Sequence, residues 1–175
     1  MLIKSFRSKT PRLHHTVLGA ETAVVIGDVT LGTDVSLWYG AVLRGDTARI
    51  SVGKGTNIQD NAVLHCDRGM PCIVGENVTV GHNAVVHSAL VGENTIVGMG
   101  ATLLSGCVIG PNSIVGGGAV VPGNLCAPEG SLILGVPAKV VRKLTAEEMA
   151  KNLDSAKHYV ELARESFGDE ASSLV

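Results

Sequence analysis

Residues 91–115 read VGENTIVGMGATLLSGCVIGPNSIV, and in this stretch an aliphatic residue recurs at every sixth position. Glycine and asparagine lie between the aliphatic positions, where a chain turns sharply. A period of six fits neither the 3.6-residue period of a helix nor the two-residue alternation of a hairpin array. It is typical of a parallel β-helix, in which three hexapeptides build one triangular coil of about 18 residues.

The same period extends over most of the chain, from Val25 to Leu125. The large aliphatic positions are Val25, Leu31, Leu37, Leu43, Val52, Ile58, Leu64, Val74, Val80, Val86, Val91, Val97, Leu103, Ile109, Val115 and Val121. Four residues after most of them stands a small or β-branched residue. The sequence therefore predicts an all-β fold, a parallel β-helix of hexapeptide repeats whose large aliphatic side chains point inward.

The composition agrees with a narrow prism. The chain has 175 residues, which is one domain's worth and enough to bury a sizeable core. Hydrophobic residues make up 45% of the chain but aromatic residues only 3%, and there are 22 glycines. Stacked Val, Ile and Leu side chains fit inside a narrow prism, whereas an ordinary globular core relies more on aromatic rings.

Charge and cysteine content exclude several classes of protein. The formal net charge of −2 offers no basic surface for nucleic acid or anionic lipid. No stretch reaches the roughly 18 unbroken apolar residues of a membrane span, and residues 1–12 lack the apolar core of a secretory signal. Four cysteines are too few for a disulfide scaffold, and we expect Cys66, Cys72 and Cys107 to be buried thiols. We therefore expect a cytoplasmic protein with reduced thiols.

The chain divides into three expected segments. Residues 1–14 form an N-terminal arm that closes the first coil, and residues 15–141 form the hexapeptide-repeat domain. Residues 145–168 form a C-terminal α-helix that packs on the prism of its own chain or of a neighbour.

The C-terminal helix has clear signals at both ends. Thr145 and Glu148 have the spacing of a capping box, and Gly168 suits the position just past the end. One apolar stripe is formed by Met149, Leu153, Ala156, Val160, Ala163 and Phe167. We expect this stripe to pack against the β-helix.

The six-residue period is interrupted in three places. Residues 49–51 add three residues, residues 70–73 add four, and the stretch from Val86 to Leu90 is one residue short. Irregularities in a solenoid usually form loops on one face, and that face is often the functional one. All three interruptions lie beside histidines.

His65 and His87 are expected to stack. His65 follows Leu64 and His87 follows Val86, and these aliphatic residues start the third hexapeptide of successive coils. The two imidazoles should therefore lie on one face, one rung apart, at about 4.8 Å. Because Zn–N bonds are about 2.0–2.1 Å long, two such imidazoles can share one metal ion.

His82 is expected to point elsewhere. It stands two residues after Val80, on a neighbouring face and around a corner from His87. It can join the other two histidines only from another chain, so three ligands would imply a homotrimer with a metal site at each interface. Each histidine taken alone would simply be an exposed polar residue, but three beside repeat irregularities favour a site.

Polar residues lie on the rungs below the histidines. Arg44 follows Leu43, one rung below His65, and Asp46 comes two residues later. Gln59 and Asp60 follow Ile58, below His82. Arg44, Asp46 and Asp60 are predicted to form an ion-pair network between protomers, and Gln59 to orient a metal-bound water.

These residues carry a resemblance to a known family. Residues 38–46 (WYGAVLRGD), residues 57–60 (NIQD), the three histidines and the ending at 135–139 (GVPAK) look like the motif set of the γ-class carbonic anhydrases. The ending is unspecific, since hexapeptide acyltransferases share it. The combination of the first two motifs with the histidines is much more specific.

The resemblance implies a left-handed β-helix, against the usual right-handed crossover rule, and a homotrimer. It implies that His65 and His87 of one chain bind the metal together with His82 of the next. Gln59 would match the residue that orients the zinc-bound hydroxide, and Arg44, Asp46 and Asp60 the interface network. Asn57 lies in the same motif as Gln59 and is a further candidate site residue.

One departure from the family pattern concerns proton transfer. The highly active members carry a long acidic loop between the first and second histidines, but only 16 residues separate His65 from His82 here. Asp67 and Glu76 are the only acids among these residues, and Thr47 stands where those enzymes have an acid. Asp67, Glu76 and Tyr159 are the candidate internal proton acceptors if one exists.

The leading hypothesis is a zinc-dependent lyase that hydrates CO2 reversibly to bicarbonate. Three neutral imidazoles leave Zn2+ an open position and lower the pKa of its bound water to about 7. Fe2+ and Co2+ also suit three imidazoles. The alternatives are a metal-dependent acyl-CoA thioesterase or other acyl hydrolase, an acyltransferase by fold analogy, and a non-catalytic trimeric subunit held together by its metal.

Overall fold

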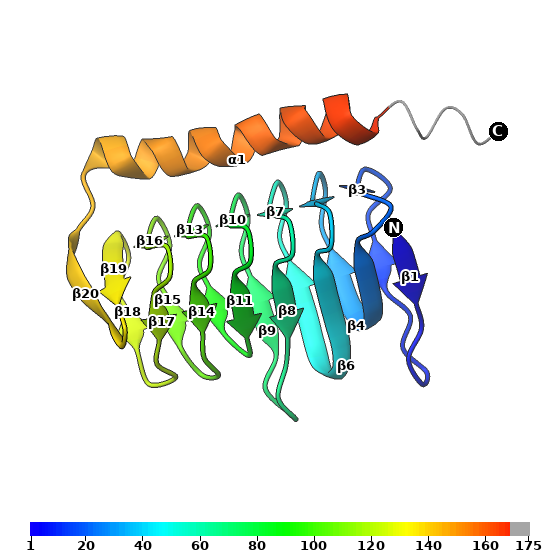
Figure 1. Cartoon of the computed structure of the whole chain (residues 1–175), viewed down its shortest axis with the longest axis horizontal. Helices are drawn as coiled ribbons and strands as arrows, with labels where there is room; N and C mark the ends of the chain where they lie inside the picture. Colours follow the sequence, from blue (N-terminus) through cyan, green and yellow to red (C-terminus); the bar gives the residue numbers. More distant parts are fainter. Residues whose placement is uncertain (169–175) are drawn as a thin grey trace.

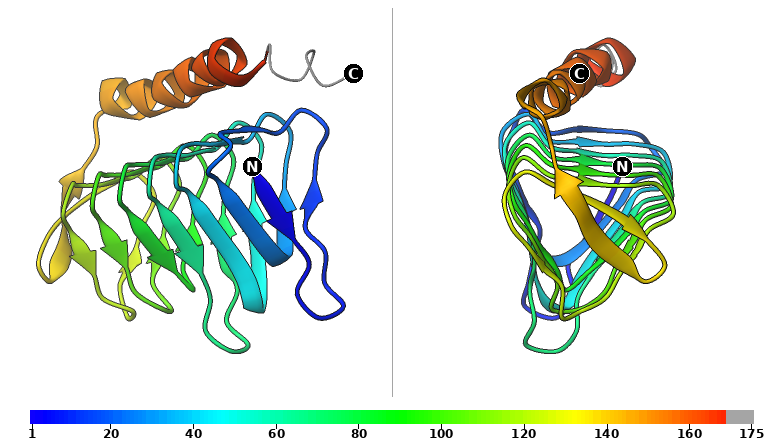
Figure 2. Two further views of the ribbon diagram at one scale, coloured as in Figure 1. Left: turned by 45° about the vertical axis from the view of Figure 1, so that its right-hand side comes forward. Right: turned by 90° about the vertical axis from the view of Figure 1, so that its left-hand side faces the viewer.

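The computed structural model describes residues 1–168, which form a left-handed parallel β-helix with one C-terminal helix. Successive coils stack into a prism of triangular cross-section (Figure 2). The helix lies along one side of the prism and runs back from the last coil towards the first (Figure 1). The predicted fold class, including the implied left hand, is confirmed.

The prism has three faces: the histidine face, the distal face and the helix face. The histidine face consists of β1 (Leu2–Lys4), β8 (Val63–His65), β11 (Val85–His87), β14 (Thr102–Leu103) and β17 (Val120–Val121). The distal face consists of β2 (Arg12–Leu13), β9 (Cys72–Val74), β12 (Leu90–Val91), β15 (Val108–Ile109) and β18 (Cys126–Ala127). Two long strands, β4 (Val24–Leu31) and β6 (Val42–Val52), bend across the corner and belong to both faces.

The helix face is a separate sheet. It consists of β3 (Leu18–Gly19), β5 (Ser36–Leu37), β7 (Asn57–Ile58), β10 (Thr79–Val80), β13 (Ile96–Val97), β16 (Ile114–Val115), β19 (Ser131–Gly135) and β20 (Ala138–Lys143). The strands pair in parallel except β20, which turns back antiparallel to β19 and closes the prism at its C-terminal end.

The interior is aliphatic, as the six-residue period predicts. Leu43, Leu64 and Val86 stack on successive rungs and have no exposed surface. Corners are turned by residues with left-handed backbone, among them Asp34, Asn61, Asn77, Asn83, Asn94 and Asn112, with φ between 52° and 59°. Asparagine and aspartate tolerate this conformation better than other residues with a side chain, which explains why they recur between the aliphatic positions.

The interruptions of the repeat become local features around the histidine face. The extra residues 49–51 are absorbed by β6, whose register with β4 shifts between Gly27 and Val29. The extra residues after β8 form a loop that projects from the prism (Figure 1) and is closed by a bridge between Asp67 and Met70. At the shortened repeat, Ser88 adopts a left-handed backbone with φ of 45°.

The N-terminal residues belong to the prism. β1 pairs in parallel with the first part of β4, and β2 with its last part, so residues 1–14 supply a partial coil below β4.

The C-terminal helix α1 (Ala146–Phe167) packs on the helix face of its own chain. Its capping box is present as predicted, and the predicted apolar stripe is buried or half-buried. Asn152, which the stripe does not include, is also buried and donates hydrogen bonds to the carbonyls of Asn94 and Ser113, both at 3.1 Å. Gly168 caps the end with right-handed rather than left-handed backbone.

Cys66, Cys72 and Cys107 are buried thiols, as expected, while Cys126 is exposed. Burial raises their pKa values to about 11, about 12 and about 11, so these thiols stay protonated at neutral pH. Within residues 1–168, no helix combines the length and apolar character that crossing a membrane requires.

Candidate metal site

His65 and His87 are direct neighbours on the histidine face. β8 pairs with β11 so that His65 faces His87, and β6 pairs with β8 so that Arg44 faces His65. The predicted ladder of Arg44, His65 and His87 is therefore confirmed. The two imidazoles are half-buried, with 19% and 29% of their side-chain surface exposed.

Asp46 anchors the lower end of this ladder. It accepts hydrogen bonds from Arg44, from Thr47 and, at 3.0 Å, from Nε2 of His65. Burial alone would raise the pKa of Asp46, but these hydrogen bonds outweigh it and lower the pKa to about 2. The carboxylate is thus charged at neutral pH and can only accept hydrogen bonds, so Nε2 of His65 carries its proton.

The outer nitrogen of His87 is committed in the same way. Nδ1 of His87 lies 2.9 Å from Oγ of Ser105, and this hydroxyl donates its only proton to Asp67. Because the oxygen of Ser105 can then only accept, Nδ1 of His87 must be the donor. Sequence analysis missed Ser105, although it stands two residues after the aliphatic Leu103, the offset at which His82 follows Val80.

The two remaining ring nitrogens face each other. Nδ1 of His65 and Nε2 of His87 are 3.0 Å apart, and in neutral rings with the protons assigned above both carry a lone pair. Two lone pairs cannot hydrogen-bond each other, so this geometry calls for an additional proton or a cation between them. Two ligands of one tetrahedral zinc ion lie about 3.3 Å apart, close to the observed separation. The donor set therefore fits a divalent metal ion of the zinc type.

His82 lies apart from this pair, in the turn between β10 and β11. Its Nδ1 is 2.7 Å from Asp60, and 38% of its side chain is exposed. Among residues 1–168, no three His, Cys, Asp or Glu side chains of one chain are grouped so that they could hold a metal ion. One chain thus brings together two of the three predicted ligands, with the third around the corner.

Gln59 links His82 to the helix face. Its amide oxygen accepts the backbone N–H of His82 at 3.2 Å, and its amide nitrogen donates to Asn57 at 3.1 Å. Asn57 in turn donates to Thr79 at 3.0 Å. Gln59 is only 4% exposed, so this network fixes its position.

Tyr159 of α1 is the candidate residue that comes from outside the β-helix. Burial and the charge of Asp60 raise its pKa, while a hydrogen bond with Gln59 opposes them. Its ring packs edge-on against Trp38 at 5.4 Å between centroids. The structure therefore brings Asn57, Gln59, Asp60, His82 and Tyr159 together at one corner.

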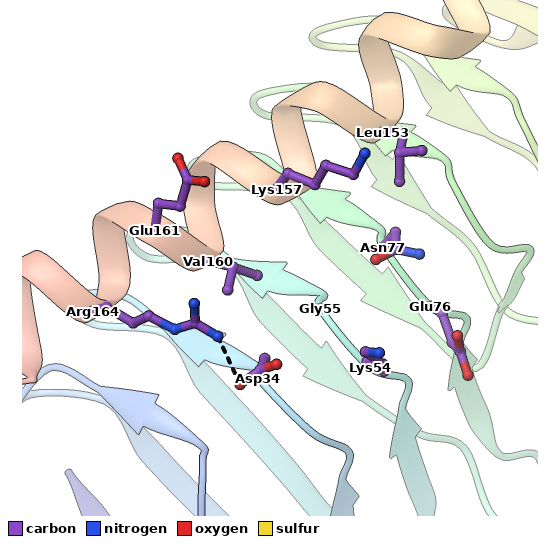
Figure 3. Close-up of a pocket in the computed structure, with 10 residues that line it drawn as sticks. All are labelled: Asp34, Lys54, Gly55, Glu76, Asn77, Leu153, Lys157, Val160, Glu161 and Arg164. Carbon is purple, nitrogen blue, oxygen red and sulfur yellow. Dashed lines mark ion pairs between the residues drawn. The ribbon is translucent and has the colours of Figure 1, made fainter.

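A groove of about 380 Å³ lies elsewhere, between α1 and the turns that precede the helix-face strands. Figure 3 shows Arg164 of α1 reaching down to Asp34 on one side of it, an ion pair of 3.5 Å, with Lys157 and Leu153 further along. None of the six histidines lines this groove. The candidate ligands therefore lie outside this groove: His65 and His87 are on the histidine face, and His82 is at the opposite corner of the helix face.

Comparison with known proteins identifies the family. The family model of the bacterial transferase hexapeptide (six repeats) matches residues 88–123. The mitochondrial γ carbonic anhydrase 2 of Arabidopsis thaliana is 45% identical over 162 residues, covering 89% of this chain and 58% of the relative. The probable carbonic anhydrase of Methanocaldococcus jannaschii is 48% identical over 144 residues, covering 82% of this chain and 91% of the relative.

The fold comparison agrees. The crystal structure of a hexapeptide transferase family protein from Anaplasma phagocytophilum superposes with a TM-score of 0.90 at 36% identity, covering 94% of this chain and 97% of that chain. This chain spans only about three fifths of the first two Arabidopsis relatives, 58% and 62% of their lengths. It spans nearly the whole of the Methanocaldococcus relative. Together with the motifs and the histidine ladder, this similarity shows that the chain belongs to the γ-class carbonic anhydrase family.

Proposed function

We propose that this protein is a γ-type carbonic anhydrase, which hydrates CO2 reversibly to bicarbonate at metal sites between the protomers of a homotrimer. The observation that carries the proposal is the 3.0 Å separation between Nδ1 of His65 and Nε2 of His87, whose other ring nitrogens are hydrogen-bonded to Asp46 and Ser105. Curated relatives named carbonic anhydrase support the reaction class.

In the proposed site, His65 and His87 of one protomer and His82 of the next hold the metal. Zn2+ is the proposed ion, and Fe2+ or Co2+ suits the same ligands. When bound, it supplies an electrophilic centre and lowers the pKa of a coordinated water to about 7. A cytoplasmic location is part of the proposal and rests on the small number of cysteines.

The surrounding residues orient the histidine ligands and the attacking water. Asp46 fixes the tautomer of His65, and Asp60 does the same for His82. Gln59, held by the N–H of His82 and by Asn57, is proposed to orient the attacking water. Arg44, 44% exposed in the single chain, is proposed to complete an ion-pair network with Asp46 and Asp60 across the protomer interface.

Acyl transfer or thioester hydrolysis is the second candidate, favoured by the similarity to a solved hexapeptide transferase family protein. The two candidates are separated by assaying metal-loaded protein for CO2 hydration by stopped flow and for hydrolysis or transfer with a panel of acyl-CoA thioesters. A His87→Ala variant is the matched control, since it removes one facing nitrogen and leaves the fold.

CO2 hydration that is lost in the control, together with one metal ion per chain, is the expected result. Thioesterase or acyltransferase activity without hydration overturns the proposal in favour of the second candidate. Stoichiometric metal with neither activity would instead make the protein a trimeric subunit whose metal joins its protomers.

A further inference from the structure

The loop between β8 and β9 is short, but it is firmly attached to the histidine face. Besides the bridge between Asp67 and Met70, it is held by the side chain of Ser88, the residue after His87. The hydroxyl of Ser88 accepts the backbone N–H of Asp67 at 2.6 Å and donates to the carbonyl of Met70 at 2.9 Å. The backbone N–H of Ser88 also donates to the carbonyl of His65 at 3.0 Å.

Ser88 adopts an unfavourable backbone conformation for this task. Its φ of 45° lies in the left-handed region, where glycine costs less than serine. Ser88 is only 3% exposed, and its hydroxyl both donates to and accepts from the loop. A conformational cost retained beside a candidate ligand points to a role for the hydroxyl. That role is to hold Asp67 above the histidine face.

Held in this way, Asp67 is linked to His87 through the hydroxyl of Ser105. The carboxylate accepts the proton of Ser105, whose oxygen accepts Nδ1–H of His87 at 2.9 Å, and Asp67 itself stays 3.8 Å from that nitrogen. Ser105 comes from the next rung above His87. The two residues therefore approach the imidazole from two different elements.

We propose that Asp67 and Ser105 are positioning residues that orient His87 and direct its Nε2 to the metal, with Ser88 clamping the loop that carries Asp67. The inference deepens the proposed function and rests on it for the metal. It gives the short loop a task of its own, because the loop provides for His87 the anchor that Asp46 provides for His65.

The first test needs no metal. Long-range 1H–15N NMR of the metal-free protein reports which nitrogen of His87 carries the proton. We expect Nδ1–H in the unaltered protein and in Ser105→Thr, which keeps the hydroxyl. We expect loss of that preference in Ser105→Ala and in Asp67→Ala. Ser51→Ala, which alters a strand serine on the distal face, is the control and should leave the Nδ1–H preference of His87 unchanged.

The second test measures affinity for Zn2+ and Co2+ by competition with a chelator. Ser105→Ala and Asp67→Ala should each weaken binding roughly 10- to 100-fold, and Ser105→Thr should restore it. The double variant should be no weaker than either single one, because the two residues act in series. Ser88→Gly, which suits the backbone but lacks the hydroxyl, should show a smaller loss. Thermal unfolding of the metal-free variants should match that of the unaltered protein.

The outcomes separate the two proposals. Unaltered affinity and an unaltered His87 tautomer in Ser105→Ala overturn the inference while leaving the metal site in place. If the unaltered protein binds neither ion, the proposed function fails, and the NMR result alone judges the positioning of His87. A loss of affinity matched by an equal loss of metal-free stability would reduce Ser105 to a structural residue and also overturn the inference.

Discussion

His82 and Asp60 form a close pair at the corner between β10 and β11, where Nδ1 of the ring lies 2.7 Å from the carboxylate. This contact commits one nitrogen of His82 and leaves Nε2 free, just as Asp46 and Ser105 leave one nitrogen free on His65 and His87. Each proposed ligand thus has one anchored and one available nitrogen. In a single chain, the third available nitrogen is separated from the other two by a corner.

The proposed sharing of sites between protomers predicts complementation. His82→Ala and His65→Ala proteins should each bind no metal at the shared sites. After subunit exchange of equal amounts, about one quarter of the sites should be rebuilt, because about three quarters of the rings are mixed and each mixed ring has one complete interface. Metal content and CO2 hydration of the mixture measure this recovery. No recovery, despite exchange demonstrated by mass spectrometry, would contradict shared sites.

Replacing Gln59 with Ala should lower turnover roughly 10- to 100-fold while the metal content stays the same. Gln59 contacts the backbone of His82 rather than its ring, so the ligand itself is untouched. Gln59→Glu is the matched control, since it retains an acceptor for the N–H of His82 but loses the N–H that reaches Asn57. Loss of metal in Gln59→Ala but not in Gln59→Glu would show that Gln59 holds His82 rather than the attacking water.

The missing acidic loop predicts that proton transfer to solvent limits hydration. The rate should therefore rise with buffer concentration at fixed pH and ionic strength, most strongly for imidazole-type buffers with a pKa near the assay pH. Stopped-flow measurements over a buffer series test this. A fast rate that is independent of buffer would instead require an internal acceptor, with Asp67, Glu76 and Tyr159 the first residues to replace.

The capping box of α1 predicts a pH-dependent contribution to stability. Hydrogen bonds from Arg142 and from the backbone of Thr145 lower the pKa of Glu148 from 4.5 to about 2. A lowered pKa in the folded state stabilises at pH values above 4.5, and this stabilisation is lost as the pH falls towards 2. The difference in unfolding free energy between the unaltered protein and Glu148→Gln should therefore shrink over that range.

Thr145→Ala is the companion variant and should cost about 1 kcal/mol at every pH at which Glu148 is charged. Denaturant unfolding monitored at several pH values measures both differences. A Glu148→Gln difference that stays constant down to pH 2 would contradict the assignment of the effect to the carboxylate.

The part of the site that follows from repeat arithmetic was predictable from the sequence. Because the parallel register pairs each hexapeptide with its equivalent in the next coil, the offset from Leu64 and Val86 was sufficient to pair His65 with His87. The same arithmetic put His82 around the corner. Fold class and helix followed from equally regular patterns.

The anchors of His87 were harder to predict, since they depend on departures from the repeat. Asp67 reaches His87 only because four extra residues fold back as a loop, and Ser88 holds that loop at the point where the period is one residue short. Asn152 was missed for a related reason, since its partners are backbone carbonyls that no side-chain pattern reveals.

The helix that runs back along the prism changes how the molecule should come apart. A stack of coils touching only their neighbours would unravel from either end, one coil at a time. Here α1 bridges coils far apart in the chain: Asn152 binds at Asn94 and Ser113, while Phe167 packs against Trp38 at 5.2 Å between ring centroids. Loss of an end coil therefore also disturbs the helix contacts in the middle, and unfolding becomes a cooperative event of the whole domain.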